Sequence, residues 1–137
     1  MKHTDVAIII VTYRFPRTKL SQLLSSLLRI GVKKGNIFIR DNTRDNIGYA
    51  GAINEIVKKQ IQKYTYFLIL NPDISFTENF IAPLLETVRQ GKADIAGPVL
   101  YDETGKVWAT TGIIDKKRFS AGLETKKLHH LTYVDYV

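Results

Sequence analysis

The feature that most constrains the fold is the apolar run from Val6 to Val11, which spells Val-Ala-Ile-Ile-Ile-Val. Its β-branched residues favour a strand. Because the run shows no alternation of apolar and polar residues, it predicts a strand that is buried on both faces. Such strands are typical of parallel sheets that helices cover on both sides. The run is far shorter than the roughly 20 residues that a helix needs to span a bilayer.

Segments with the apolar spacing of amphipathic helices alternate with short apolar runs along the next part of the chain. The predicted elements are, in order, a helix over 20–28 that Gly31 ends, a strand over 36–40, a helix over 53–61, a strand over 66–70, a helix over 77–90 with Pro83 in its early part and Gly91 at its end, and a strand over 93–96. Alternating strands and helices predict an α/β fold with an open, mostly parallel sheet and right-handed crossovers.

The pattern changes after Gly97 and Pro98. The elements predicted for this part are a β-hairpin of 99–101 and 106–108 around the turn Asp102-Glu103-Thr104-Gly105, a polar and basic loop or flexible flap over 113–132, and the start of another strand over 132–137. We therefore divide the chain into an α/β core, residues 1–98, and a hairpin with a flap, residues 99–137.

The chain is basic, with a formal net charge of +7. The basic residues are scattered, and a dense cluster such as Lys116-Lys117-Arg118 is too short to be a nucleic-acid-binding arm. A soluble protein with a basic surface explains this charge, and so does attraction to a phosphorylated substrate or to anionic lipid. We do not expect nucleic acid to be the partner, because the sequence has neither a nucleic-acid-binding motif nor a concentrated basic stripe.

Cysteine is absent, which excludes disulfides and thiolate metal sites and fits a reducing compartment. The residues that precede Val6 and the run itself do not form a signal peptide, because no small-residue cleavage site follows. We therefore expect a cytoplasmic protein whose charge allows peripheral contact with a membrane surface. The oligomeric state stays open.

Polar residues follow the predicted strands at three places: Thr12-Tyr13-Arg14, Asp41-Asn42-Thr43 and Asn71-Pro72-Asp73. In open α/β sheets, ligands bind beyond the carboxyl ends of the strands, so these segments are candidate sites. The backbone groups of the first segment and the ring of Tyr13 can contact a base. Taken alone, each of the first two segments is better explained as a turn between a strand and the next element. The Asn-Pro dipeptide of the third also favours a turn, which is compatible with ligand binding.

The carboxylates of Asp41 and Asp73 suit different kinds of ligand. Asp41 can accept hydrogen bonds from a ribose hydroxyl or from the imide N–H of uracil or thymine. Asp73 can hold a hard divalent cation that bridges two phosphates, since such cations need few protein carboxylates where phosphates supply other oxygens. The cation would offset charge that develops on a departing diphosphate.

The segment between these places, residues 46–54, contains Gly48 and other small residues that lead into a helix. Backbone without large side chains can approach a ligand closely, and a helix N-terminus favours anions. The same composition also fits a helix start that packs against the sheet. The segment matches neither GxGxxG nor GxxxxGK[ST], so a Rossmann dehydrogenase and a P-loop NTPase are disfavoured.

Several motifs, in order, resemble those of family 2 glycosyltransferases. They are the opening strand Val6–Tyr13, Asp41-Asn42-Thr43 for the "DN-S" element, Asn46–Asn54 for "N-x-G-(F/Y)-(A/G)-(G/A)-x-x-N", Leu68–Asp73 for the "L-N-P-D" form of the DxD motif, and Gly97–Lys106 for the "G-P-x-(I/L)-Y-D-x-x-G-K" hairpin of rhamnosyltransferase-like members. The likeness covers essentially the whole chain.

The resemblance implies a GT-A fold, truncated at the C-terminus, whose donor-binding portion is this chain. It implies inverting transfer of a sugar, rhamnose by likeness of the hairpin, from a UDP- or dTDP-sugar to a glycan or lipid-linked acceptor, with Mg²⁺ or Mn²⁺. The nucleotide-sugar-binding residues implied by position are Thr12, Tyr13, Arg14, Asp41, Asn42, Asn46, Gly48, Asn54, Asn71 and Asp73, with Asp73 as the metal ligand.

The sequence departs from the family pattern in places. Arg14 stands where Asn is common, and Asn71 stands where a first acidic residue often lies. The stretch after the "DN-S" element is shortened, so Asp41 and Asp45 could exchange roles. The general base, an acidic residue of a later motif, is expected beyond Val137, so the catalytic residue is unknown.

Two other functions remain as alternatives. One is a catalytically incomplete module or fragment that binds a nucleotide-sugar without turnover. The other is nucleic-acid binding, which would show a steep salt dependence. A sugar nucleotidyltransferase is disfavoured, because residues 11–16 are not a Gly-rich loop with basic residues.

Overall fold

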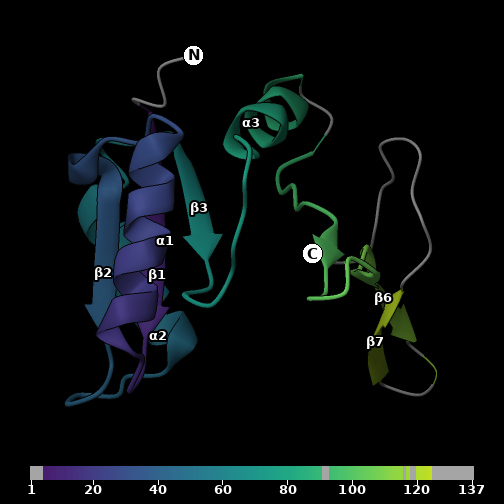
Figure 1. Cartoon of the computed structure of the whole chain (residues 1–137), viewed down its shortest axis with the longest axis horizontal. Coiled ribbons are helices and arrows are strands. Elements are labelled where there is room, and N and C mark those ends of the chain that lie inside the picture. Colours follow the sequence, from purple (N-terminus) through teal and green to yellow (C-terminus); the bar gives the residue numbers. More distant parts are fainter. Residues whose placement is uncertain (1–4, 91–92, 116, 118–119, 125–137) are drawn as a thin grey trace. The chain divides into compact units, whose positions relative to one another are not determined.

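The computed structural model of the chain describes residues 5–90, 93–115, 117 and 120–124. They fall into two units, residues 1–79 and residues 80–137, and the order of elements along the chain is shown in Figure 1. The first unit holds a sheet with its helices. The described residues of the second unit form one helix and two β-hairpins.

Strand β1, Val6–Thr12, is the centre of a three-stranded parallel sheet in the order β2-β1-β3. Its neighbours are β2, Ile37–Asp41, and β3, Tyr66–Leu70. All 7 residues of β1 are buried, which confirms the strand predicted from the unbroken apolar run. The mixed α/β class and the parallel sheet are confirmed as well.

Helices cover both faces of this sheet. Figure 1 shows α1, Arg17–Arg29, in front of the sheet and α2, Tyr49–Gln60, behind it. Ile9 and Val11 form a buried cluster with α2 residues, among them Ile56. Because strand side chains alternate, the residues between them face the α1 side of the sheet. No helix in the described part of the chain is long and apolar enough to cross a membrane.

Helix α1 ends at a glycine, as predicted. The Gly31 N–H donates to the Leu28 carbonyl at 3.0 Å, and the Val32 N–H donates to the Leu27 carbonyl at 3.1 Å. This is the hydrogen-bond pattern of the Schellman motif, which needs a left-handed residue after the helix. Gly31 supplies it with φ of +91°. A 3₁₀ turn, Lys34–Asn36, then leads directly into β2.

In the second unit, α3 covers Ile81–Arg89. Strands β4, Leu100–Tyr101, and β5, Val107–Ala109, pair antiparallel, which confirms the predicted hairpin. In its turn, Asp102 Oδ1 accepts hydrogen bonds from the backbone N–H groups of Thr104 and Lys106 at 2.9 and 3.0 Å. Strands β6, Thr111–Asp115, and β7, Ser120–Glu124, form a second antiparallel hairpin.

Two predictions in this part are wrong. Residues 93–96 form no strand, and Ile95 is 71% exposed. A short apolar segment becomes a strand only beside a partner strand, and none of the described strands pairs with this one. The predicted flap over 113–132 contains β7 and most of β6, because cross-strand pairing orders a segment whose polar sequence hid the strands.

Other boundaries shift by a few residues or cannot be compared. The third helix begins at Ile81 rather than at residue 77, which places Pro83 in its first turn, where a missing N–H breaks no helical hydrogen bond. The predicted stop at Gly91, the rest of the flap from 125 and the strand over 132–137 lie outside the described residues.

Gly31→Ala should lower the stability of the chain by about 1 kcal/mol, because an L-residue is strained at positive φ. An added Cβ at Gly31 would meet nothing within 4 Å, so the cost is that of the backbone alone. Gly35→Ala is the matched control: its Cβ would also enter open space, but Gly35 has no positive φ. Urea unfolding measures both. Equal effects of the two substitutions would contradict the Schellman assignment.

Candidate functional site

The register of the sheet brings the ends of its strands to one edge. Thr12 pairs with Asp41, and Ile10 pairs with Leu70, all in parallel. The segments that leave β1, β2 and β3 therefore start within about two residues of one another along the strand direction. Asp41 ends β2 and Asp73 follows β3, so the two carboxylates belong to the same edge of the sheet, on either side of β1.

The hydroxyl of Thr43 joins the first two of these segments. The backbone N–H of Arg14 donates to Thr43 Oγ1 at 2.9 Å. Thr43 Oγ1 in turn donates to Asp41 Oδ1 at 2.5 Å, and the Thr43 backbone N–H donates to the same carboxylate oxygen at 2.9 Å. In addition, the Asn42 N–H donates to the Thr12 carbonyl at 2.8 Å. The loops after β1 and β2 are thus one hydrogen-bonded unit.

These contacts set the charge state of Asp41. Hydrogen bonds from the side chain and backbone of Thr43 lower the pKa of the Asp41 carboxyl below its ordinary value. The residue is exposed at the edge of the sheet, so its carboxylate is ionised at neutral pH and accessible to a ligand. Such a group can accept hydrogen bonds from hydroxyls or from an imide N–H.

Arg14 adopts an unusual backbone conformation beside this carboxylate. Its φ is +48°, in the left-handed region that non-glycine residues rarely occupy. The hydrogen bond from its N–H to Thr43 holds the residue there. Its guanidinium lies 5.2 Å from the centroid of the exposed Tyr13 ring, a cation–π contact. The pair presents an aromatic face and a positive charge after β1.

Arg40 fixes the other side of the second segment. Its Nε donates to Glu55 of α2 at 3.1 Å, and one terminal nitrogen, Nη2, pairs with Asp45 at 3.0 Å. The other terminal nitrogen, Nη1, donates to the Asp41 carbonyl at 2.7 Å. The hydrogen bond with Glu55 is the main cause that raises the pKa of Arg40. The carboxylate of Asp45 is therefore engaged inside the loop by Arg40.

The start of α2 depends on a glycine and two asparagines. Gly48, with φ of +78°, precedes the helix, and its N–H donates to Asn46 Oδ1 at 3.0 Å. Asn42 is only 3% exposed, and its Nδ2 donates to the Gly48 carbonyl at 3.1 Å. Asn42 Oδ1 is buried without a hydrogen-bond partner. Asn54 lies beyond the first turn of α2 and is exposed, and no side-chain hydrogen bond among the described residues joins it to these loops.

Tyr49 joins α2 to the third segment. Its hydroxyl donates to Asn71 Oδ1 at 3.1 Å. Burial raises the pKa of Tyr49, so the phenol is protonated at neutral pH. The third segment thereby connects to the same network of loops as the first two.

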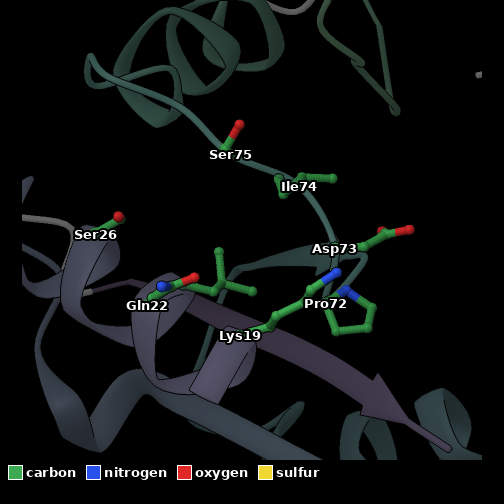
Figure 2. A pocket seen from close by; sticks show the side chains of 8 residues that line it. Lys19, Gln22, Ser26, Pro72, Asp73, Ile74 and Ser75 are labelled. Atoms are coloured by element: carbon green, nitrogen blue, oxygen red, sulfur yellow. The ribbon is translucent and has the colours of Figure 1, made fainter. Parts of the chain in front are cut away.

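Asp73 borders a small hollow between α1 and the segment after β3. Figure 2 shows this hollow, which has a volume of about 220 Å³. Its polar lining residues are Lys19, Gln22, Ser26, Asp73 and Ser75. In Figure 2 the carboxylate of Asp73 points away from the α1 side chains. Over the described residues, no ion pair joins it to Lys19.

The fit of this edge to a divalent cation is limited. No group of three His, Cys, Asp or Glu side chains that could hold a metal occurs among the described residues. Asp73 offers an exposed carboxylate, and Asn71 Oδ1 already accepts a hydrogen bond from Tyr49, which leaves that oxygen one lone pair. This donor set suits Mg²⁺ or Mn²⁺ only where phosphate oxygens and water complete the coordination.

The sequence assigned no individual role to several residues that shape this edge: Arg40, Thr43, Tyr49 and Lys19. The Asp41-x-Thr43 spacing is a signal for a side-chain-bonded turn and would have indicated Thr43. The partners of Arg40 and Tyr49, and the place of Lys19 at the hollow, depend on helices α1 and α2 packing beside the strands, which no local pattern encodes.

Together, the parallel sheet flanked by helices and the acidic groups at its carboxyl edge are consistent with a nucleotide-sugar-binding domain of the GT-A class. Residues 5–135 match the model of glycosyl transferase family 2, and the chain belongs to that family. Comparisons with curated proteins and with solved structures found no match. Membership makes the protein a glycosyltransferase and implies a nucleotide-sugar donor and an acceptor; divalent cations are common in the family.

Thr43→Val should raise the pKa of Asp41, because the hydroxyl that stabilises the carboxylate is lost. In the wild type this stabilisation is present above the ordinary pKa of aspartate and is lost as the pH falls through the lowered pKa of the folded protein. An NMR titration of the Asp41 carboxyl measures the change. Thr43→Ser keeps the hydroxyl and is the control. An unchanged Asp41 pKa in the valine variant would show that the hydroxyl does not stabilise this carboxylate.

Proposed function

We propose that the chain binds the nucleoside diphosphate of a UDP- or dTDP-sugar at the carboxyl edge of the β2-β1-β3 sheet, within an α/β core of residues 1–98. The observation that supports this best is the ionised, exposed Asp41, held by Thr43 in a loop that is also bonded to the β1 loop. Asp41 accepts hydrogen bonds from the ribose or from the base imide. Asp45 is the weaker candidate for this role, because Arg40 already binds its carboxylate.

We assign the other candidate residues to the same site. Thr12 and the exposed ring of Tyr13 border the base, and Arg14 supplies positive charge toward the diphosphate. Asn42, Asn46 and Gly48 shape the loop through the contacts they make with one another. Asn54, more than one turn along α2, is exposed and reaches the donor only if the sugar extends along the helix.

The reaction we propose is direct displacement with inversion. An acceptor hydroxyl on a glycan or lipid-linked substrate attacks the anomeric carbon on the face opposite the leaving diphosphate. Asp73 is the residue that would hold Mg²⁺ or Mn²⁺, whose chemistry is to neutralise charge on that diphosphate. Rhamnose is the sugar that the hairpin sequence favours. No described residue is assigned as the general base.

A binding module without turnover is the second candidate. The observation that favours it is the sparse cation site, with one carboxylate at Asp73 and an amide at Asn71. In both cases the net charge of +7 assists an anionic ligand, and it would also favour peripheral contact with an anionic membrane surface.

Calorimetry with UDP and dTDP, in MgCl₂ and in EDTA, tests the proposal. We expect Asp41→Asn to weaken binding by about 10-fold or more in both conditions, since it removes a charged acceptor of ligand hydrogen bonds. Asp5→Asn is the control for charge, because it changes the net charge in the same way and Asp5 directly precedes β1, at the opposite edge of the sheet. Wild-type affinity in Asp41→Asn would exclude Asp41 from the site.

Asp73→Asn should abolish the gain in affinity that Mg²⁺ provides while leaving binding in EDTA unchanged or slightly stronger, because a carboxylate without its cation repels phosphate. The same calorimetric series measures this. A full Mg²⁺ effect in the variant would exclude Asp73 as the cation ligand. A transfer assay with the wild-type chain separates an enzyme from a module that only binds.

A further inference from the structure

The contact between Tyr49 and Asn71 restricts what Asn71 can offer to a ligand. A side-chain amide has an oxygen that only accepts hydrogen bonds and a nitrogen that only donates them. Asn71 Oδ1 accepts the hydroxyl proton of Tyr49 at 3.1 Å. The phenol is protonated at neutral pH, because burial raises the pKa of Tyr49. This bond holds Oδ1 toward Tyr49 and leaves it one lone pair, while both N–H donors of the NH₂ group remain for a ligand.

The position of Tyr49 is set by the loop that precedes it. Tyr49 is the first residue of α2, directly after Gly48 in its left-handed conformation. Gly48 is held through its N–H by Asn46 and through its carbonyl by the buried Asn42. The hydroxyl that orients Asn71 is thus anchored to the same loop that carries Asp41.

The position of Asn71 is set by its neighbours in the chain. It follows Leu70, which is buried at the end of β3, and it precedes Pro72, whose ring fixes φ. Asn71 itself is exposed at the carboxyl edge of the sheet. Asp73 lies two residues after Asn71. Asp73 and Lys19 of α1, which carries an ammonium group, both line the hollow shown in Figure 2. The segment that carries the Asn71 amide thus leads into a hollow lined by one ammonium group and one carboxylate.

We propose that Asn71 binds a diphosphate oxygen of the donor through its NH₂ group and is not a ligand of the cation. This inference rests on the proposed function and concerns the same site. Tyr49 is a positioning residue, since it acts through Asn71: it holds the amide oxygen and so turns the donors outward. Within the Asn-Pro-Asp segment, Asp73 is then the residue through which donor binding depends on the cation.

The test compares Asn71→Ala in EDTA and in MgCl₂, with UDP, dTDP and the free nucleosides uridine and thymidine as ligands. A donor to phosphate works with or without a cation, so we expect affinity for the diphosphates to fall about 10-fold in both conditions. Affinity for the nucleosides, which have no phosphate, should not change. Asp5→Asn again serves as the control, and circular dichroism confirms that each variant is folded.

Two further variants sharpen the result. Asn71→Asp replaces the donors by a negative charge, so it should weaken diphosphate binding in EDTA more than alanine does and recover part of the affinity in MgCl₂. Tyr49→Phe leaves the amide free to rotate and should give a smaller loss than Asn71→Ala, again in both conditions.

A spectroscopic measurement on the wild type avoids any question of folding. In ¹⁵N-labelled protein, UDP should shift the side-chain NH₂ signals of Asn71 in EDTA, before a cation is added. If Asn71→Ala binds diphosphates normally in EDTA and loses only the gain from MgCl₂, Asn71 is a cation ligand and the inference is wrong while the proposed function stands. If the wild type binds no nucleotide in either condition, the proposed function fails and the inference with it.

Discussion

The pairing of β1 with a parallel strand on each side is the constraint on which the rest of the first unit depends. A central parallel strand has no face or edge in water, so it must be apolar throughout, and β1 is buried along its whole length. The same pairing aligns the strand ends, since Thr12 stands beside Asp41 and Ile10 beside Leu70. Polar residues that are far apart in the sequence consequently lie at one edge of the sheet, beyond the hydrophobic core, where hydrogen bonds hold them in place.

At that edge the backbone leaves the sheet and must find other hydrogen-bond partners. Side chains provide them. Thr43 accepts a hydrogen bond from the backbone of the β1 loop, Arg40 donates to the carbonyl of Asp41, and Asn42 donates to the Gly48 carbonyl before α2. The groups that make the turns are therefore also the groups that determine the charge and orientation of candidate ligand-binding residues. The sequence alone could not exclude either role for these residues, because turn formation and ligand binding use the same side chains.

The sequence predicted the first unit well because its elements depend on local patterns. The unbroken run at β1, the helical spacing of leucines in α1 and the stop at Gly31 each express one physical requirement. Prediction was poorer where structure depends on a distant partner. Residues 93–96 have strand-like composition but no paired neighbour among the described strands, while β6 and β7 are strands because they pair with each other. Likewise, the candidate residues could be named from their places after strands, but the Tyr49–Asn71 and Arg40–Glu55 contacts require α2 to lie beside the sheet.

Family membership identifies the class of reaction, but the chemistry of the edge is decided by individual residues. Two carboxylates close together repel each other and both repel a diphosphate unless a cation is bound, so their affinity for the donor is tied to that cation. An amide in place of one carboxylate removes part of this repulsion and replaces it with hydrogen-bond donors. The cost is a weaker hold on the cation, which then depends on the phosphates of the donor for most of its ligands. In such a site the nucleotide and the cation bind as a pair, with the nucleotide as the component that the protein itself recognises.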